Sequence, residues 1–173
     1  KKELTRRSFL KLAGVGALAV AMSGSLTGCD VIDNLKDMDS GSAAIGDVKF
    51  MLSASVRSNG VGGQENDVSY QPTCEIRNNS KKAVTYGGSG SDCEVIITGV
   101  LTDKNGKEYP MTYAGKNGSA PAGEKYEVKD FKLVAVGKGL YMEGSKVVTT
   151  FTYNGRKAVF TEYNNGNITS KVE

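Results

Sequence analysis

The chain has 173 residues and a formal net charge of +3, a length that suits one domain and is short for two. It contains no His and no Trp, so a His-based triad, an imidazole general base and His-ligated zinc or copper sites are excluded. Its three cysteines are too few for a four-thiolate cluster or a dense disulfide scaffold.

The positive charge belongs to the first segment of the chain. Residues 1–28 hold five basic residues and one acidic residue, whereas residues 29–173 hold 17 basic and 18 acidic residues. The part after residue 28 therefore has a net charge of −1. We predict no nucleic-acid partner, because no cluster of basic residues remains outside the first segment.

The chain opens with a pattern typical of an export signal. A basic stretch, residues 1–11, precedes an apolar run over residues 12–22. Eleven residues rise about 16 Å as a helix, which is about half the thickness of a hydrocarbon core. The run is too short for a permanent membrane span, so residues 1–28 are predicted to be a cleavable signal peptide.

A short motif makes the export route more specific. The segment Thr5-Arg6-Arg7-Ser8-Phe9-Leu10-Lys11 resembles the twin-arginine export signal, with matches at Arg6, Arg7, Phe9, Leu10 and Lys11. This resemblance implies that the twin-arginine translocase exports the chain after it has folded. An ordinary amphipathic helix with a chance pair of arginines is the alternative.

The segment Leu26-Thr27-Gly28-Cys29 resembles the lipobox of bacterial lipoproteins. The resemblance implies that lipoprotein-processing enzymes attach a diacylglyceryl group to Cys29 and cleave the chain after Gly28. Cys29 would then anchor the mature chain at the outer face of the cytoplasmic membrane, because two acyl chains hold more firmly than one. Asp30, by the same resemblance, favours the inner membrane where there are two. A free or disulfide-bonded Cys29 is the alternative.

Residues 29–44 are predicted to be the lipidated cysteine and a flexible acidic tether, with Ser40-Gly41-Ser42 as a joint before the folded domain. The segment Asp37-Met38-Asp39-Ser40-Gly41 begins like a Ca²⁺ loop. It lacks the third oxygen ligand before the glycine and the distal Glu at the required spacing. We therefore predict a solvated spacer and no metal site here.

Residues 45–173 change to short alternating runs separated by turn residues, which predict strands. The run 93–102 is apolar on both sides, so we expect a central strand there. Pro72 interrupts the run that begins at Val68 and predicts an edge or a bulge. Asn154-Gly155 predicts a type I′ hairpin. Residues 126–136 are expected to form one strand.

These runs predict seven to nine strands and an all-β antiparallel β-sandwich, with a β-barrel as the alternative. Segments 75–82, 103–109 and 121–124 resemble the turns of immunoglobulin-like domains in uncharacterised bacterial surface lipoproteins. The resemblance implies an immunoglobulin-like β-sandwich over residues 45–173. The chain departs from the antibody pattern, because it has no Trp and its two later cysteines are too close in sequence.

Cys74 and Cys93 fall at positions where the alternation predicts burial. In an oxidising exterior we predict a disulfide between them, worth roughly 3 kcal/mol in the chain-entropy model. Two separate buried thiols are the alternative. A soft-metal site from Cys74, Cys93, Met111 and Met142 is a weaker hypothesis, because scattered Met more often belongs to a core. We expect no metal and no cofactor.

The sequence shows no recognisable set of catalytic residues. A Ser-x-x-Lys spacing occurs at residues 8–11, inside the signal segment, and the carboxylate pairs Asp92/Glu94 and Glu124/Glu127 suit ordinary strand or loop positions. We therefore predict a non-catalytic binding or interaction module whose partner is an envelope protein or polymer. The alternatives are an accessory subunit of an envelope complex, a His-free hydrolase and a soft-metal-binding protein.

Overall fold

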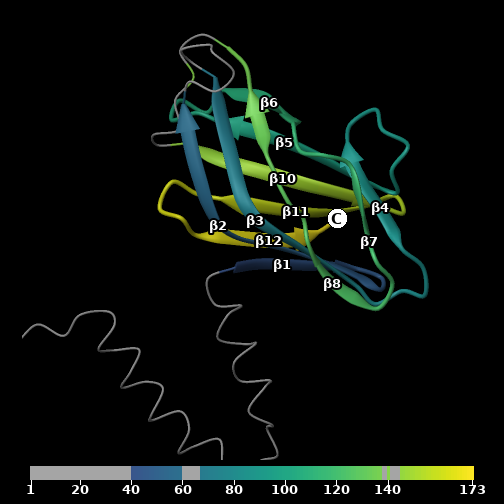
Figure 1. Cartoon of the computed structure of the whole chain (residues 1–173). Helices are drawn as coiled ribbons and strands as arrows, with labels where there is room; N and C mark the ends of the chain where they lie inside the picture. The colour runs from purple at the N-terminus through teal and green to yellow at the C-terminus, as the bar shows by residue number, and fades with distance from the viewer. Residues whose placement is uncertain (1–39, 60–66, 138–139, 141–144) are drawn as a thin grey trace, which may run out of the picture. The chain divides into compact units, whose positions relative to one another are not determined.

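The chain divides into two units, residues 1–38 and 39–173, and the computed structural model describes residues 40–59, 67–137, 140 and 145–173. The described residues form twelve strands and no helix (Figure 1). The strands are β1 (Ser40–Ile45), β2 (Val48–Asn59), β3 (Val68–Asn78), β4 (Val84–Gly88), β5 (Val95–Thr102), β6 (Glu108–Tyr113), β7 (Gly118–Ala120), β8 (Glu124–Glu127), β9 (Leu133–Ala135), β10 (Lys146–Tyr153), β11 (Arg156–Glu162) and β12 (Ile168–Val172). The prediction of an all-β fold is confirmed for these residues.

The strands of the second unit lie in two layers that share one hydrogen-bonded sheet. Layer A holds β1, β2, β3, β8 and β9, and layer B holds β4, β5, β6, β7, β10, β11 and β12. The pairing of β6 with β9 joins the two layers. Among the described strands every pair is antiparallel except β4 with β5. Figure 1 shows β2 and β3 running across the direction of β5, β10 and β11, as in steeply crossed rather than aligned sheets.

The two ends of the strand order, β1 and β12, lie next to each other. The Ser170 hydroxyl on β12 donates a hydrogen bond to the Ser42 carbonyl on β1 at 2.6 Å. A Cβ at Gly41 would lie 2.5 Å from the Ile168 side chain and 3.0 Å from Phe160, so only glycine allows β1 to approach this closely. The unit is therefore nearly barrel-shaped.

The core lies between the layers and is centred on aromatic rings. Phe50 on β2 stacks on Phe151 of β10, with ring centroids 4.8 Å apart. Phe160 on β11 and Phe131, between β8 and β9, contact the same Phe151 ring at 5.6 Å and 6.1 Å. These rings join residues from β2, β10 and β11, so burial of the alternating apolar positions holds the layers together.

Local turn chemistry sets several of the connections. Asn154 (φ 49°) and Gly155 (φ 73°) join β10 to β11, which confirms the predicted type I′ hairpin. The Asp103 carboxylate accepts hydrogen bonds from the backbone N–H groups of Asn105 and Lys107, at 2.8 Å and 2.9 Å. This contact closes the turn between β5 and β6.

The predicted irregularity at Pro72 is a bulge. Pro72 lies on β3 and pairs with Ser55 on β2, where the register shifts between Ser53 and Ser55. Proline has no backbone N–H to give to the ladder, so the bulge lies where a ladder hydrogen bond is missing. β3 itself lies inside the layer, between β2 on one side and β8 and β9 on the other.

Three expectations about strand boundaries differ from the structure. The described strands number twelve rather than seven to nine. Residues 40–44, expected to end the tether, belong to β1, because their backbone pairs with β2. The single strand expected over residues 126–136 is two strands, since the backbone turns between them at Asp130 with φ 56°.

Candidate functional site

The predicted export and anchoring residues lie outside the described residues. They are Arg6, Arg7, Phe9, Leu10, Lys11, Leu26, Thr27, Gly28 and Cys29. Their roles remain predictions from the sequence. The folded unit begins with β1 at Ser40, and ten residues separate that position from Cys29.

Cys74 and Cys93 are free thiols in the structure, and each contributes to raising the pKa of the same tyrosine. Cys74, on β3, is buried, and Cys93, between β4 and β5, is half-buried. Burial raises the pKa of the Cys74 thiol, and the neighbouring Glu75 adds to this. Burial also raises the pKa of Tyr113 to about 12, with contributions from Cys74, Asp130 and Cys93.

We expect a peptide map of the nonreduced, exported protein to contain a cross-link between Cys74 and Cys93. The thiolate is the reacting form of cysteine, so the raised pKa of Cys74 slows closure of the bond at neutral pH. The bond would accordingly form more slowly than between two exposed thiols. Recovery of two alkylated thiols from the same preparation would eliminate the disulfide.

The soft-metal hypothesis also named two methionines. Met111 is buried, and Met142 lies outside the described residues.

A buried carboxylate links the two layers. Glu162 on β11 is 3% exposed, and its two oxygens accept hydrogen bonds from Ser55 Oγ of β2 at 2.5 Å and Tyr70 OH of β3 at 2.6 Å. Hydrogen bonds to a charged group are stronger than neutral ones and are costly to break when buried. The arrangement therefore fixes layer A on layer B at this point. No spacing in the sequence links these three residues.

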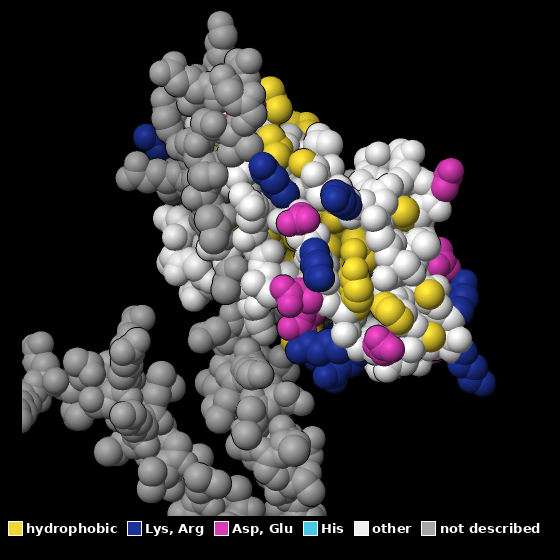
Figure 2. All heavy atoms as spheres, viewed as in Figure 1, with side chains coloured by type: hydrophobic (Ala, Val, Ile, Leu, Met, Phe, Trp, Pro, Cys, Tyr) yellow, Lys and Arg dark blue, Asp and Glu magenta, His cyan; other side chains and the backbone are white. Residues whose placement is uncertain are grey.

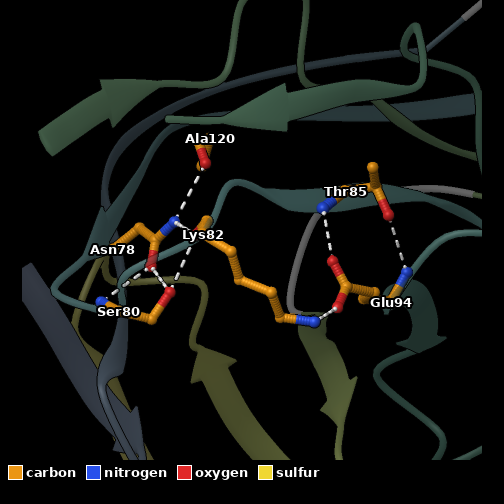
Figure 3. Close-up of polar contacts among 6 residues, drawn as sticks. All are labelled: Asn78, Ser80, Lys82, Thr85, Glu94 and Ala120. Carbon is orange, nitrogen blue, oxygen red and sulfur yellow. Dashed lines mark hydrogen bonds and ion pairs between the residues drawn. The ribbon is translucent and has the colours of Figure 1, made fainter. Parts of the chain in front are cut away.

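A second polar network holds the turn between β3 and β4 (Figure 3). The Asn78 amide donates to the carbonyls of Lys82 at 2.8 Å and Ala120 at 3.0 Å, and its oxygen accepts from Ser80. Lys82 Nζ lies 2.7 Å from Glu94 Oε1, and this pairing raises the pKa of Lys82 and lowers that of Glu94. Each of these groups has a partner within the network, so the network stabilises the turn and joins it to Ala120 of β7 rather than presenting free groups.

The outer face of layer A carries charges of both signs. Lys49, Arg77 and Lys125 lie opposite one another across β2, β3 and β8. Lys125 forms an ion pair with Glu75 at 2.6 Å, along the diagonal of the same face. Figure 2 shows charged side chains of both signs beside a stripe of hydrophobic ones. Paired charges of this kind are typical of a solvated surface.

The outer face of layer B is different, and we call it the open face. It consists of the outward side chains of five adjacent strands: Ile96, Thr98 and Val100 of β5, Pro110 and Thr112 of β6, Val148, Thr150 and Thr152 of β10, Val159 and Thr161 of β11, and Thr169 of β12. None of these side chains is charged, and all except Pro110 are β-branched. The predicted central strand β5 lies between β6 and β10, and on this face its side chains are half-buried, while Val159 of β11 is buried.

Among the described residues, no cluster of three or more Cys, Asp or Glu side chains could hold a metal ion. No helix in the described part of the chain has the length and apolarity to cross a membrane. Comparison with known protein families and with curated proteins finds no match to this chain.

Proposed function

We propose that this protein is a lipid-anchored, extracytoplasmic β protein whose folded unit is a non-catalytic binding or interaction module. Its place is the outer face of the cytoplasmic membrane, and its anchor is a diacylglyceryl group on Cys29. The observation that carries the proposal is the order of motifs: the Arg6-Arg7 segment, then an apolar run, then Leu26-Thr27-Gly28-Cys29. Each motif lies where the next processing step requires it.

The spacing between the anchor and the folded unit supports this arrangement. Ten residues separate Cys29 from Ser40, where β1 begins. Such a segment spans at most about 40 Å when fully extended. A unit on this tether would stay close to the membrane surface and meet partners that are themselves in the envelope.

An immunoglobulin-like β-sandwich is the finer fold that we propose for the unit. It is supported by two mainly antiparallel layers and by turns at the positions that carry the resemblance, such as Asn78 to Ser80 and Asp103 to Lys107. Three features of the unit instead favour the barrel alternative. They are the crossed strands, the parallel β4–β5 pair and the β6–β9 link.

The binding role is supported by the open face. A strand with one side in the core and one in water normally alternates apolar and polar residues, yet β5 has Ile96 and Val100 on its outward side. Both side chains are half-buried, and apolar groups that gather on the outer side of a sheet are typical of contact surfaces. A His-free hydrolase is the second candidate, because Ser55 Oγ lies 2.5 Å from the Glu162 carboxylate. Tyr70 occupies the other carboxylate oxygen, which favours a structural role for this group.

The proposal is tested by cross-linking in intact cells, followed by purification of the protein from membranes under denaturing conditions. We expect a cross-linked product of defined mass that contains this chain and an envelope protein or polymer. A stable product of fixed composition without cross-linker would indicate an accessory subunit instead. Recovery of the bare monomer under all conditions would contradict both interaction roles.

A further inference from the structure

Asparagine is followed by glycine at four places that the structure describes. They are Asn105-Gly106, Asn117-Gly118, Asn154-Gly155 and Asn165-Gly166, and all four asparagines are exposed. An asparagine in this position is prone to react with its own backbone. Glycine has no side chain to hinder the attack of its nitrogen on the side-chain carbonyl carbon of the asparagine. Exposure and sequence alone therefore do not distinguish the four pairs.

Two of these pairs have a glycine nitrogen that is held in a hydrogen bond. The Gly106 N–H donates to the Asp103 carbonyl at 3.0 Å. The Gly166 N–H donates to the Tyr163 carbonyl at 2.9 Å. The nitrogen must lose this proton before it can attack a carbonyl carbon, so the hydrogen bond has to break first. Both turns therefore protect the asparagine that precedes the glycine.

The pair Asn117-Gly118 is restrained by packing and by strand pairing. The Asn117 side chain lies against β4, where a Cβ added to Gly87 would overlap Asn117 Oδ1. Gly118 is the first residue of β7 and pairs with Tyr86 of β4. Reaction at this pair would have to move the amide away from Gly87 and disturb the end of the ladder. This asparagine is therefore protected as well.

The pair Asn154-Gly155, in the hairpin between β10 and β11, has neither kind of restraint. Tyr153 and Arg156 form the last pair of the ladder, so Asn154 and Gly155 lie beyond it. No hydrogen bond within the described part of the chain uses the Gly155 N–H or the Asn154 side chain. Both reacting groups are exposed, and no bond of the folded unit has to break to free either of them.

We propose that Asn154 is a site of spontaneous modification, which the fold selects among these four pairs. The Gly155 nitrogen loses its proton to hydroxide and bonds to the Asn154 side-chain carbonyl carbon, and the amide nitrogen leaves as ammonia. Water then opens the resulting succinimide at either carbonyl, which gives aspartate or isoaspartate. Each product places a new negative charge beside Arg156, and isoaspartate adds a methylene to the backbone of a two-residue turn. The inference goes beyond the proposed function and does not depend on the lipid anchor.

The test is incubation of the full chain in mildly alkaline buffer with detergent, with and without urea, followed by peptide mapping. Each conversion replaces NH₂ by OH and raises the mass of a peptide by about 1 Da. Cleavage after Lys and Arg isolates Asn154 in residues 147–156, and cleavage after Glu places Asn105 in residues 95–108. In the folded protein, Asn154 should convert at least about fivefold faster than the other three asparagines. In urea all four rates should agree within about twofold, because the protection by the fold is lost.

Two variants test the cause of this selectivity. Asp103→Ala removes the carboxylate that accepts hydrogen bonds from the Asn105 and Lys107 N–H groups, so the turn loosens. It should raise the Asn105 rate at least about threefold and leave the Asn154 rate unchanged. Asn154→Gln should abolish conversion in residues 147–156, because glutamine closes a less favourable six-membered ring. Thermal unfolding checks that each variant is folded.

Three results would overturn the inference. The first is an Asn154 rate in the folded protein that does not exceed the Asn105 rate. The second is a ranking of the four asparagines that urea leaves unchanged, because the fold would then have no part in it. The third is an Asp103→Ala variant in which the Asn105 rate stays the same.

Discussion

Cys29→Ala is expected to release most of the protein from the membrane fraction and to abolish its labelling by radioactive fatty acid. The thioether forms only on a thiol, so alanine leaves no acceptor for the diacylglyceryl group. Two acyl chains are lost, each contributing about 0.8 kcal/mol per buried methylene. What remains is an apolar run of eleven residues, about half a hydrocarbon core in length, which holds far less firmly. We expect the membrane-bound fraction to fall at least about tenfold after a carbonate wash.

The matched control for this experiment is Ser25→Ala, which changes a residue in the same segment and keeps the acceptor thiol. A variant with Lys at both Arg6 and Arg7 separates delivery from anchoring. It should accumulate unprocessed inside the cell, whereas Cys29→Ala should be blocked only at lipidation. Full retention and labelling of Cys29→Ala would show that the lipobox resemblance is misleading. Normal translocation of the double Lys variant would contradict the twin-arginine route alone.

Features determined by neighbouring residues were predictable from the sequence. The hairpin at Asn154-Gly155 needs two consecutive residues with positive φ, and Asn-Gly provides them at little cost. The bulge opposite Pro72 follows from the missing N–H of one residue. Such signals depend on residues that are close in sequence, so the local structure that they predict does not depend on the tertiary contacts of the rest of the chain.

Features determined by distant contacts were not predictable. β1 begins at Ser40 because its backbone pairs with β2 and its Gly41 lets the strand approach Ile168 and Phe160, more than a hundred residues away. The Ser-Gly-Ser composition by itself indicates a loop. Glu162 likewise reaches Tyr70 and Ser55 across 92 and 107 residues, with no pattern linking the three in the sequence.

The candidate interaction surface was missed for a related reason. Strand alternation shows which side chains share a side, but it does not show whether a second layer covers that side. The apolar residues on both sides of β5 therefore indicated burial on both. The outward side of β10 indicates a face that is not part of the core. It carries Val148, Thr150 and Thr152, and a strand buried on both sides would have Val or Ile at the two Thr positions.

Phe151→Ala is expected to cost about 4 kcal/mol of the free energy of unfolding, within the range for removal of a buried aromatic ring. Phe151 is fully buried, and its ring contacts Phe50, Phe131 and Phe160, so a cavity would open where the layers meet. These neighbours belong to different strands and loops, and they cannot all move inward to fill the space. For a unit of this size, the loss should lower the unfolding midpoint by roughly 10–20 °C.

Thr152→Ala is the control for this change, because Thr152 is the next residue on β10 and points outward from the core. Its effect should stay within about 0.5 kcal/mol, as at other surface positions. Phe151→Leu should be intermediate, since leucine refills part of the space left by the ring. Urea unfolding and thermal unfolding, both followed by circular dichroism, measure the free energy and the midpoint temperature of all three variants. A midpoint for Phe151→Ala close to that of Thr152→Ala would mean that the aromatic cluster does not hold the layers together, and the packing of β2 on β10 would need to be revised.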